Sequence, residues 1–211
     1  MARILGPSCR QCRREGVKLF LKGERCVGAK CALIKSNYTP GQHGLTRRRG
    51  KASDYSFQLR EKQKVKRVYG ILEKQFRNYF EKADSKEGVT GEILLQLLET
   101  RFDNVVYRLG FAPSRSLSRQ LVNHDHFTVN GKKVNIPSLQ LKVGDKIEVI
   151  KESASNNYFN EDFKGRLLAT KVPSWLKLDP KKLSGELISL PLRDELDLEI
   201  DERLIVELYS K

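Results

Sequence analysis

Four cysteines are the residues of this 211-residue chain whose types and spacing point most clearly to chemistry. Two residues separate Cys9 from Cys12, four separate Cys26 from Cys31, and thirteen lie between the two pairs. Two close pairs joined by a loop allow four thiolates to converge on the corners of a tetrahedron, the geometry that suits Zn²⁺. Because four sulfur ligands leave no open position for water, the spacing predicts one structural zinc ion and no catalytic metal.

Other interpretations of the cysteines stay open at this point. Four thiolates also suit an iron–sulfur cluster, and clustered thiols can serve a structural or redox role without a metal. Disulfides need an oxidising compartment, and the start of the chain has no secretory signal. Arg10, Arg13 and Arg14 lie among the cysteines; their charges would favour thiolates and would turn this part of the chain toward phosphates.

Positive charge is concentrated at the start of the chain. The net charge is +14, and residues 1–50 hold 12 basic and two acidic residues, whereas residues 151–211 hold 10 basic and 12 acidic ones. Such a basic segment repels itself and favours an anionic partner, with nucleic acid first and an anionic membrane surface second. A merely soluble basic surface is the alternative. No apolar run approaches the roughly 18 residues of a membrane span.

A basic loop is expected after the cysteines, over residues 38–51. Pro40, Gly41, Gly44 and Gly50 break regular structure there. We expect an extended loop that lies on phosphates and becomes ordered on binding, the alternative being a flexible linker. The candidate RNA contacts of this loop are His43, Arg47, Arg48, Arg49 and Lys51.

Helical periodicity begins at Ser53 and continues to Phe80, with apolar residues three and four apart. Gly70 interrupts the pattern, which predicts two helices or one kinked helix. Cations occupy the other side, either as a solvated surface or as contacts to a phosphate backbone. The candidate RNA contacts of this region are Lys62, Lys64, Lys66, Arg67, Tyr69 and Arg77.

Residues 101–150 predict a compact α+β module. Two short helices are separated by Gly110, and Ser114 or Ser116 can cap the second of them. Asn130-Gly131 favours a type I′ hairpin, and an alternating strand follows over 146–150. On the second helix we expect an exposed polar row whose guanidinium groups can follow one phosphate strand. That row consists of Arg115, Ser118, Arg119 and Asn123.

The last third of the chain differs in character. Residues 151–182 give no firm element, because Asn156, Asn157 and Gly165 weaken a helix, although the patch at Trp175 predicts burial. From 194 the sequence alternates acidic and apolar residues, and Asp201 can cap a final helix. We expect this acidic end to pack on the basic helical half.

Several segments together resemble one family. "RFDNVVYRLGFAPSRSLSRQLVNHDHFTVNGKKVNIPS" over 101–138 is similar to the αL RNA-binding motif and, more closely, to the family of small-subunit ribosomal protein four. "MARILGPSCRQCRREG", "YTPGQHG", "REKQKVKRVYG" and "IDERLIVELYSK" also resemble that family, and the cysteines stand where its zinc-bearing bacterial members have theirs. One departure is Asp125, where many members have glycine.

The resemblance implies an α+β protein of two lobes. One lobe is mainly helical with a zinc-stapled N-terminal arm, and an αL RNA-binding lobe with a small β-sheet is inserted in it. The corresponding ranges are 1–50 for the basic arm, 51–98 completed by 183–211 for the helical domain, and 99–182 for the αL domain.

The resemblance also implies a function. The family is a structural part of the small ribosomal subunit that binds 16S ribosomal RNA at a multi-helix junction, nucleates assembly of the body of the subunit, and contributes to translational accuracy by contacting ribosomal protein five. Its other partners are the neighbouring small-subunit proteins near the site where messenger RNA enters. We therefore expect a cytoplasmic ribosomal protein with no membrane partner and no small-molecule substrate.

Two other classes of function compete with this one. The αL motif recurs in RNA-modifying enzymes, but the chain lacks the nucleophile, phosphate-loop and dinucleotide motifs of an enzyme, so we expect no catalysis. A zinc-dependent DNA-binding regulator would need a helix-turn-helix or finger histidines after the cysteines, and neither is present.

Overall fold

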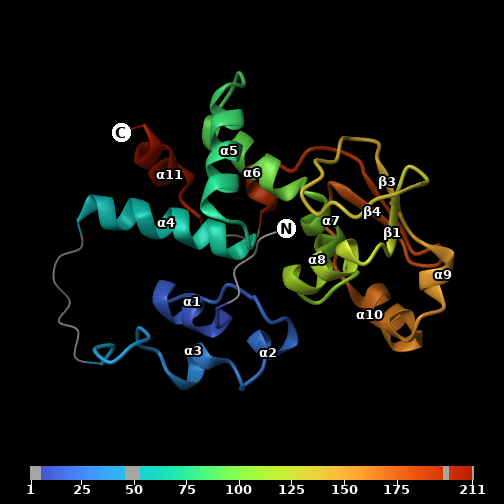
Figure 1. Ribbon diagram of the computed structural model, residues 1–211, viewed down its shortest axis with the longest axis horizontal. Helices are drawn as coiled ribbons and strands as arrows, with labels where there is room; N and C mark the ends of the chain where they lie inside the picture. The colour runs from blue at the N-terminus through green and yellow to red at the C-terminus, as the bar shows by residue number, and fades with distance from the viewer. Residues whose placement is uncertain (1–5, 46–52, 197–199, 211) are drawn as a thin grey trace. The chain divides into compact units, whose positions relative to one another are not determined.

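The computed structural model describes residues 6–45, 53–196 and 200–210 (Figure 1). The chain divides into two compact units, Met1–Leu94 with Leu198–Lys211, and Leu95–Asp197. Helices and one small antiparallel sheet confirm the predicted α+β class. Within the described ranges, no helix combines the length and the apolarity that a membrane crossing requires.

The first unit begins with three short helices, α1 (Ser8–Glu15), α2 (Glu24–Val27) and α3 (Ala32–Lys35). We call residues 6–45 the cysteine segment. Its buried residues are Leu19 and three of the cysteines, Cys12, Cys26 and Cys31. The segment therefore has almost no aliphatic core of its own.

Three further helices belong to this unit. Ser53 caps α4 (Asp54–Val68), and Gly70 adopts a φ of 65° before α5 (Glu73–Asp84), which confirms that the helical pattern is broken at that glycine. The final helix α11 (Glu202–Tyr209) packs along α4 (Figure 1). The ring of Tyr209 stacks on Phe80 with centroids 4.6 Å apart, so the final helix packs on the basic helical part.

Helix α6 (Thr90–Glu99) carries the chain from the first unit into the second. There α7 (Phe102–Arg108) and α8 (Arg115–Asn123) precede a sheet with the strand order β2-β1-β3-β5-β4. The strands are β1 (Phe127–Val129), β2 (Lys132–Lys133), β3 (Lys146–Val149), β4 (Leu176–Asp179) and β5 (Ser184–Leu187). The remaining elements are α9 (Lys151–Ala154), η1 (Asn157–Phe159), α10 (Glu161–Ala169) and η2 (Arg193–Glu195).

The predicted turn chemistry is present in this unit. Asn130 and Gly131 both have positive φ, 50° and 76°, and join β1 to β2 as the hairpin pattern requires. Asp125 also adopts a positive φ, 63°, a conformation that glycine reaches at lower cost. The Oγ of Ser114 accepts from the backbone N–H of Leu117 and caps α8.

Helix α10 and strands β4 and β5 are among the elements that were not expected from the sequence. Helix α10 forms despite Gly165 because Asn160 caps it and Phe163 and Leu167 are buried in the core. Strands β4 and β5 pair antiparallel beside β3, where Trp175 and Leu187 are buried. The sequence groups residues 183–211 with the helical part, whereas β5 lies in the sheet of the second unit.

Candidate nucleic-acid interface

The four cysteines converge on one small cavity. Cys9 and Cys12 lie on α1, Cys26 on α2 and Cys31 immediately before α3, and all four line a cavity of about 20 Å³ together with Lys22 and Arg25. None of them forms a disulfide. The cavity has room for a single water-sized atom.

The chemistry of this cavity suits a cation. Burial raises the pKa of the Cys12 thiol, and the neighbouring cysteines add to the rise, so a stable thiolate there needs a compensating positive charge. The backbone N–H of Lys22 lies 3.3 Å from the Sγ of Cys26 and donates to it, a contact typical of metal-bound thiolates. As the side chains stand, however, no three His, Cys, Asp or Glu groups of the described residues are arranged to hold a metal ion.

Exposed cations cover the outside of the cysteine segment. The seven exposed basic side chains of residues 6–45, which we call the basic face, are Arg10, Arg14, Lys18, Lys22, Arg25, Lys30 and Lys35. Residues 6–45 contain two carboxylates. Glu24 is exposed, whereas the side chain of Glu15 is only 1% exposed. The surface therefore presents a strong excess of positive charge to any polyanion.

Helix α1 separates its polar and buried sides cleanly. Arg10 and Arg14, four residues apart, are exposed, while Cys12 is buried, so two cations on one side can follow a single phosphate strand. Arg13 is half-buried, because its guanidinium lies 4.4 Å from the ring centroid of Tyr38 and its Nε donates to the Tyr38 carbonyl oxygen. His43 is exposed on the following loop.

The four remaining cations predicted for that loop lie at 46–52, outside the described residues. They are Arg47, Arg48, Arg49 and Lys51.

All five predicted cations of α4 and α5 pair with carboxylates inside the first unit. The Nζ atoms of Lys62 and Lys66 lie 2.6 and 2.9 Å from the carboxylate oxygens of Glu73. Arg77, which is exposed, lies 3.2 Å from Glu81.

Two more cations of α4 are held in the same way. Lys64 pairs with Glu61 at 2.6 Å, and Arg67 pairs with Glu15.

Two of the candidate RNA contacts of this region are buried. Lys62 is 8% exposed and Tyr69 is 4% exposed. Docking of α11 buries Lys62, since its Nζ lies 5.7 Å from the ring centroid of Tyr209. A contact to a helix 140 residues later cannot be read from the local period of α4.

Glu73 organises this group of charges. Burial opposes its ionisation, but hydrogen bonds from Lys62, Lys66 and Tyr209 outweigh that effect and lower its pKa from 4.5 to about 2. The same contact and burial raise the pKa of Tyr209. Glu73 thus joins α4, α5 and α11 through one carboxylate.

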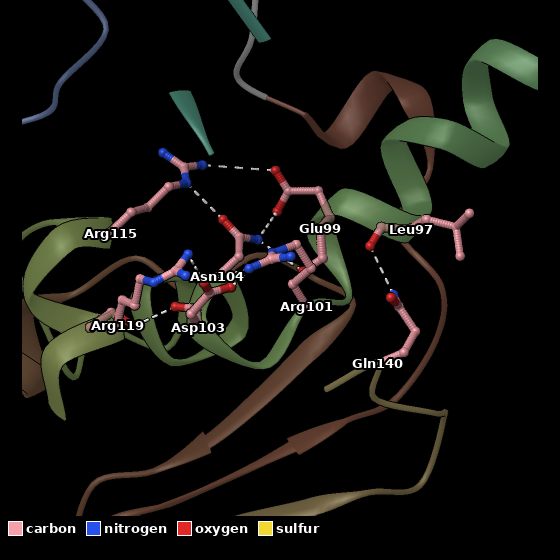
Figure 2. Close-up of polar contacts among 9 residues, drawn as sticks. Leu97, Glu99, Arg101, Asp103, Asn104, Arg115, Arg119 and Gln140 are labelled. Carbon is pink, nitrogen blue, oxygen red and sulfur yellow. Dashed lines mark hydrogen bonds and ion pairs between the residues drawn. The ribbon is translucent and has the colours of Figure 1, made fainter. Parts of the chain in front are cut away.

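In the second unit, a buried polar network joins α6, α7 and α8 (Figure 2). The carboxylate of Glu99, fully buried, accepts from Nε and Nη2 of Arg108 at 2.9 and 2.8 Å and from Nδ2 of Asn104 at 2.7 Å. Asn104 in turn accepts from Nε of Arg115 at 2.7 Å, and the Arg115 guanidinium lies 4.5 Å from the ring centroid of Tyr107.

A second carboxylate completes the network. Asp103 accepts from Nε and Nη2 of Arg101 at 3.0 and 2.7 Å, and Nη1 of Arg119 lies 3.6 Å away (Figure 2). The hydroxyl of Ser118 donates to the backbone carbonyl oxygen of Asp103. These contacts tie α8 to α7 with two carboxylates shared among four arginines.

The expectation of an exposed row on α8 is wrong for three of its four members, since only Asn123 is exposed. Ser118 is fully buried and Arg119 is 8% exposed, whereas Arg115 is half-buried and Asn123 is exposed. Asp103 on α7 provides the buried charge that draws Arg119 inward. The sequence did not reveal the roles of Glu99, Asn104 and Arg108. The only signal available in it was that acidic residues and arginines occur a few positions apart in this stretch.

Comparisons with known proteins bear on what these surfaces bind. Residues 3–99 match the family described as "Ribosomal protein S4/S9 N-terminal domain", and residues 100–147 match the family described as "S4 domain". The chain is 59% identical to "Small ribosomal subunit protein uS4" of Heliobacterium modesticaldum and 58% identical to that of Geotalea daltonii, over the whole length of each protein. The chain belongs to the uS4 family.

Membership of the uS4 family confirms the resemblance seen in the sequence. The S4 domain match covers α7, α8 and the hairpin, and with them the members of the buried network other than Glu99, which is the last residue of the N-terminal domain match. A family of ribosomal proteins also agrees with the expectation that the chain is not an enzyme.

Proposed function

We propose that this uS4 protein is a structural component of the small ribosomal subunit that binds 16S ribosomal RNA directly at a multi-helix junction. Full-length identity of 54–59% to small-subunit proteins of eight bacteria carries this proposal. Binding would nucleate assembly of the body of the subunit. Contact with ribosomal protein five would link the protein to translational accuracy, in the cytoplasm and without a small-molecule substrate.

Binding by charge and shape is the mechanism that the side chains favour. The basic face offers seven exposed cations that can take the place of counterions along an RNA backbone. Each unit also carries cations already paired with carboxylates, such as Lys66 with Glu73 and Arg115 with Glu99, whose positions are defined before RNA arrives. Such preorganised cations select RNA whose phosphates already have the matching arrangement.

A pair of substitutions tests the phosphate contacts. Replacing Arg10 and Arg14 by Ala should weaken 16S RNA binding and lower the slope of log K against log salt by about one per lost contact. The control replaces Lys177 and Arg203, two exposed cations outside the proposed contacts, and removes the same charge. If both double variants lose affinity and slope equally, the cysteine segment has no special place in RNA binding.

We also propose that the four cysteines bind one structural Zn²⁺ ion. Supporting this are the convergence of all four thiols on one cavity, the raised pKa of Cys12 and the lack of an aliphatic core in the segment. A bound metal would supply the stabilisation that a core normally gives.

Elemental analysis of the purified protein tests the zinc site. We expect one zinc per chain, retained through dialysis, and no visible absorption from an iron–sulfur cluster. Replacing Cys12 by Ser should release the metal and expose the cysteine segment to protease. Protein that is fully folded but free of zinc and iron would contradict the proposal.

A further inference from the structure

Glu15 stands out because a carboxylate is costly where it lies. It is the last residue of α1, immediately before Gly16, and its side chain is only 1% exposed. A negative charge at the C-terminal end of a helix opposes the helix dipole, and burial of an unpaired carboxylate costs several kcal/mol. Its partners must therefore account for its position.

Those partners come from α4. Nη1 of Arg67 and Nη1 of Arg60 both contact Oε1 of Glu15, the second at 3.4 Å. Arg60 and Arg67 are 45 and 52 residues further along the chain, so the contact joins two distant parts of the first unit. Helix α1 packs against α4 at this point.

The negative charge of Glu15 also offsets the repulsion between two basic helices, α1 and α4. Both helices are basic, and Arg14 and Lys64 also lie close enough to act on Glu15. Without a negative charge between them, α1 and α4 would repel each other. Since Leu19 is the one buried aliphatic residue of the cysteine segment, apolar packing alone has little to hold the segment on α4.

We infer that Glu15 is a positioning residue that fastens the cysteine segment to helix α4 and thereby fixes the place of the basic face for RNA binding. Arg10 and Arg14 stand on the same helix as Glu15, so the ion pairs orient the cations that face outward. This inference rests on the proposed function for its RNA readout, but the docking itself can be measured without RNA.

Two substitutions that each remove one negative charge should change the affinity for 16S RNA differently if Glu15 has this positioning role. Glu15→Gln should lower the affinity for 16S RNA about tenfold at temperatures where the protein stays folded. Glu87→Gln, at an exposed position in the turn after α5, should leave affinity unchanged or raise it slightly. A purely electrostatic role predicts a rise for both, and a role in stability alone predicts a lower unfolding temperature without loss of affinity; either result would overturn the inference.

Exchanging the charges provides the rescue. Glu15→Lys combined with Arg67→Glu should recover most of the affinity lost in Glu15→Gln, and it decides the question if that single variant does not fold. Amide hydrogen exchange of residues 6–45 without RNA should be faster in Glu15→Gln and return toward the wild type in the exchanged protein. Equal exchange rates in all three proteins would refute the docking role, whereas a wild type that docks but binds no 16S RNA would refute the proposed function instead.

Discussion

At the scale of single residues, buried carboxylates organise the cations of this protein. Glu99, Asp103 and Glu15 each hold two or more basic side chains while themselves almost hidden from solvent. A buried charge is tolerated only when its partners satisfy it. The arginines that a sequence pattern assigns to RNA are therefore partly committed to holding helices together.

Replacing Glu99 by Gln tests this view. The substitution leaves Arg108, whose side chain is 11% exposed, without its bidentate partner, and removing one member of a buried pair costs about 3–5 kcal/mol. Urea unfolding should show a loss of that size. Glu152→Gln, at an exposed site on α9, serves as the control and should change stability by less than about 0.5 kcal/mol; equal effects would mean that the network contributes little.

The depressed pKa of Glu73 predicts how stability changes with pH. Since its folded pKa of about 2 lies below its usual value of 4.5, its contribution is fully present above pH 4.5 and is lost as the pH falls toward 2. The difference in unfolding free energy between the wild type and Glu73→Gln should therefore be largest near pH 6 and shrink on acidification. A difference that stays constant from pH 6 to pH 3 would contradict the role of this carboxylate.

At the scale of elements, the glycines of β5 and α10 have opposite surroundings. A Cβ at Gly185 in β5 would lie 2.5 Å from a methyl carbon of Leu109, whereas one at Gly165 in α10 would meet nothing within 4 Å. The first glycine allows α7 to pack closely on the sheet. The second only costs helix stability.

Alanine at these two positions should therefore act in opposite directions. Gly185→Ala should destabilise the protein by about 1–3 kcal/mol through overpacking, and Gly165→Ala should stabilise it by about 0.5–1 kcal/mol. Thermal unfolding measures both. Combining Gly185→Ala with Leu109→Ala should reduce the cost of the first change, and an undiminished cost would place the strain elsewhere.

What the sequence could predict depends on how local the determinant is. The hairpin at Asn130-Gly131, the cap at Ser114 and the break at Gly70 follow from residues within a few positions, and all three are present. Helix α10 needs the aromatic core to outweigh Gly165, and the burial of Ser118 and Arg119 needs Asp103 on another helix. Long-range partners of this kind leave no local period in the sequence.

At the scale of the whole molecule, charge is divided along the chain. The cysteine segment exposes seven cations, while Glu207 near the acidic end accepts from Gln58 of α4 at 2.9 Å. This division leaves the basic surface uncompensated by the protein's own acids. A polyanion with a defined arrangement of phosphates is the partner that such a surface favours.

Competition binding is the most direct test of the central claim that preorganised cations select folded RNA. At about 0.15 M salt, the protein should bind folded 16S RNA about a hundredfold or more tightly than an unstructured homopolymer of equal length, because only the folded RNA presents matching phosphates. Equal affinity for both would contradict the account, since charge alone would then explain the binding.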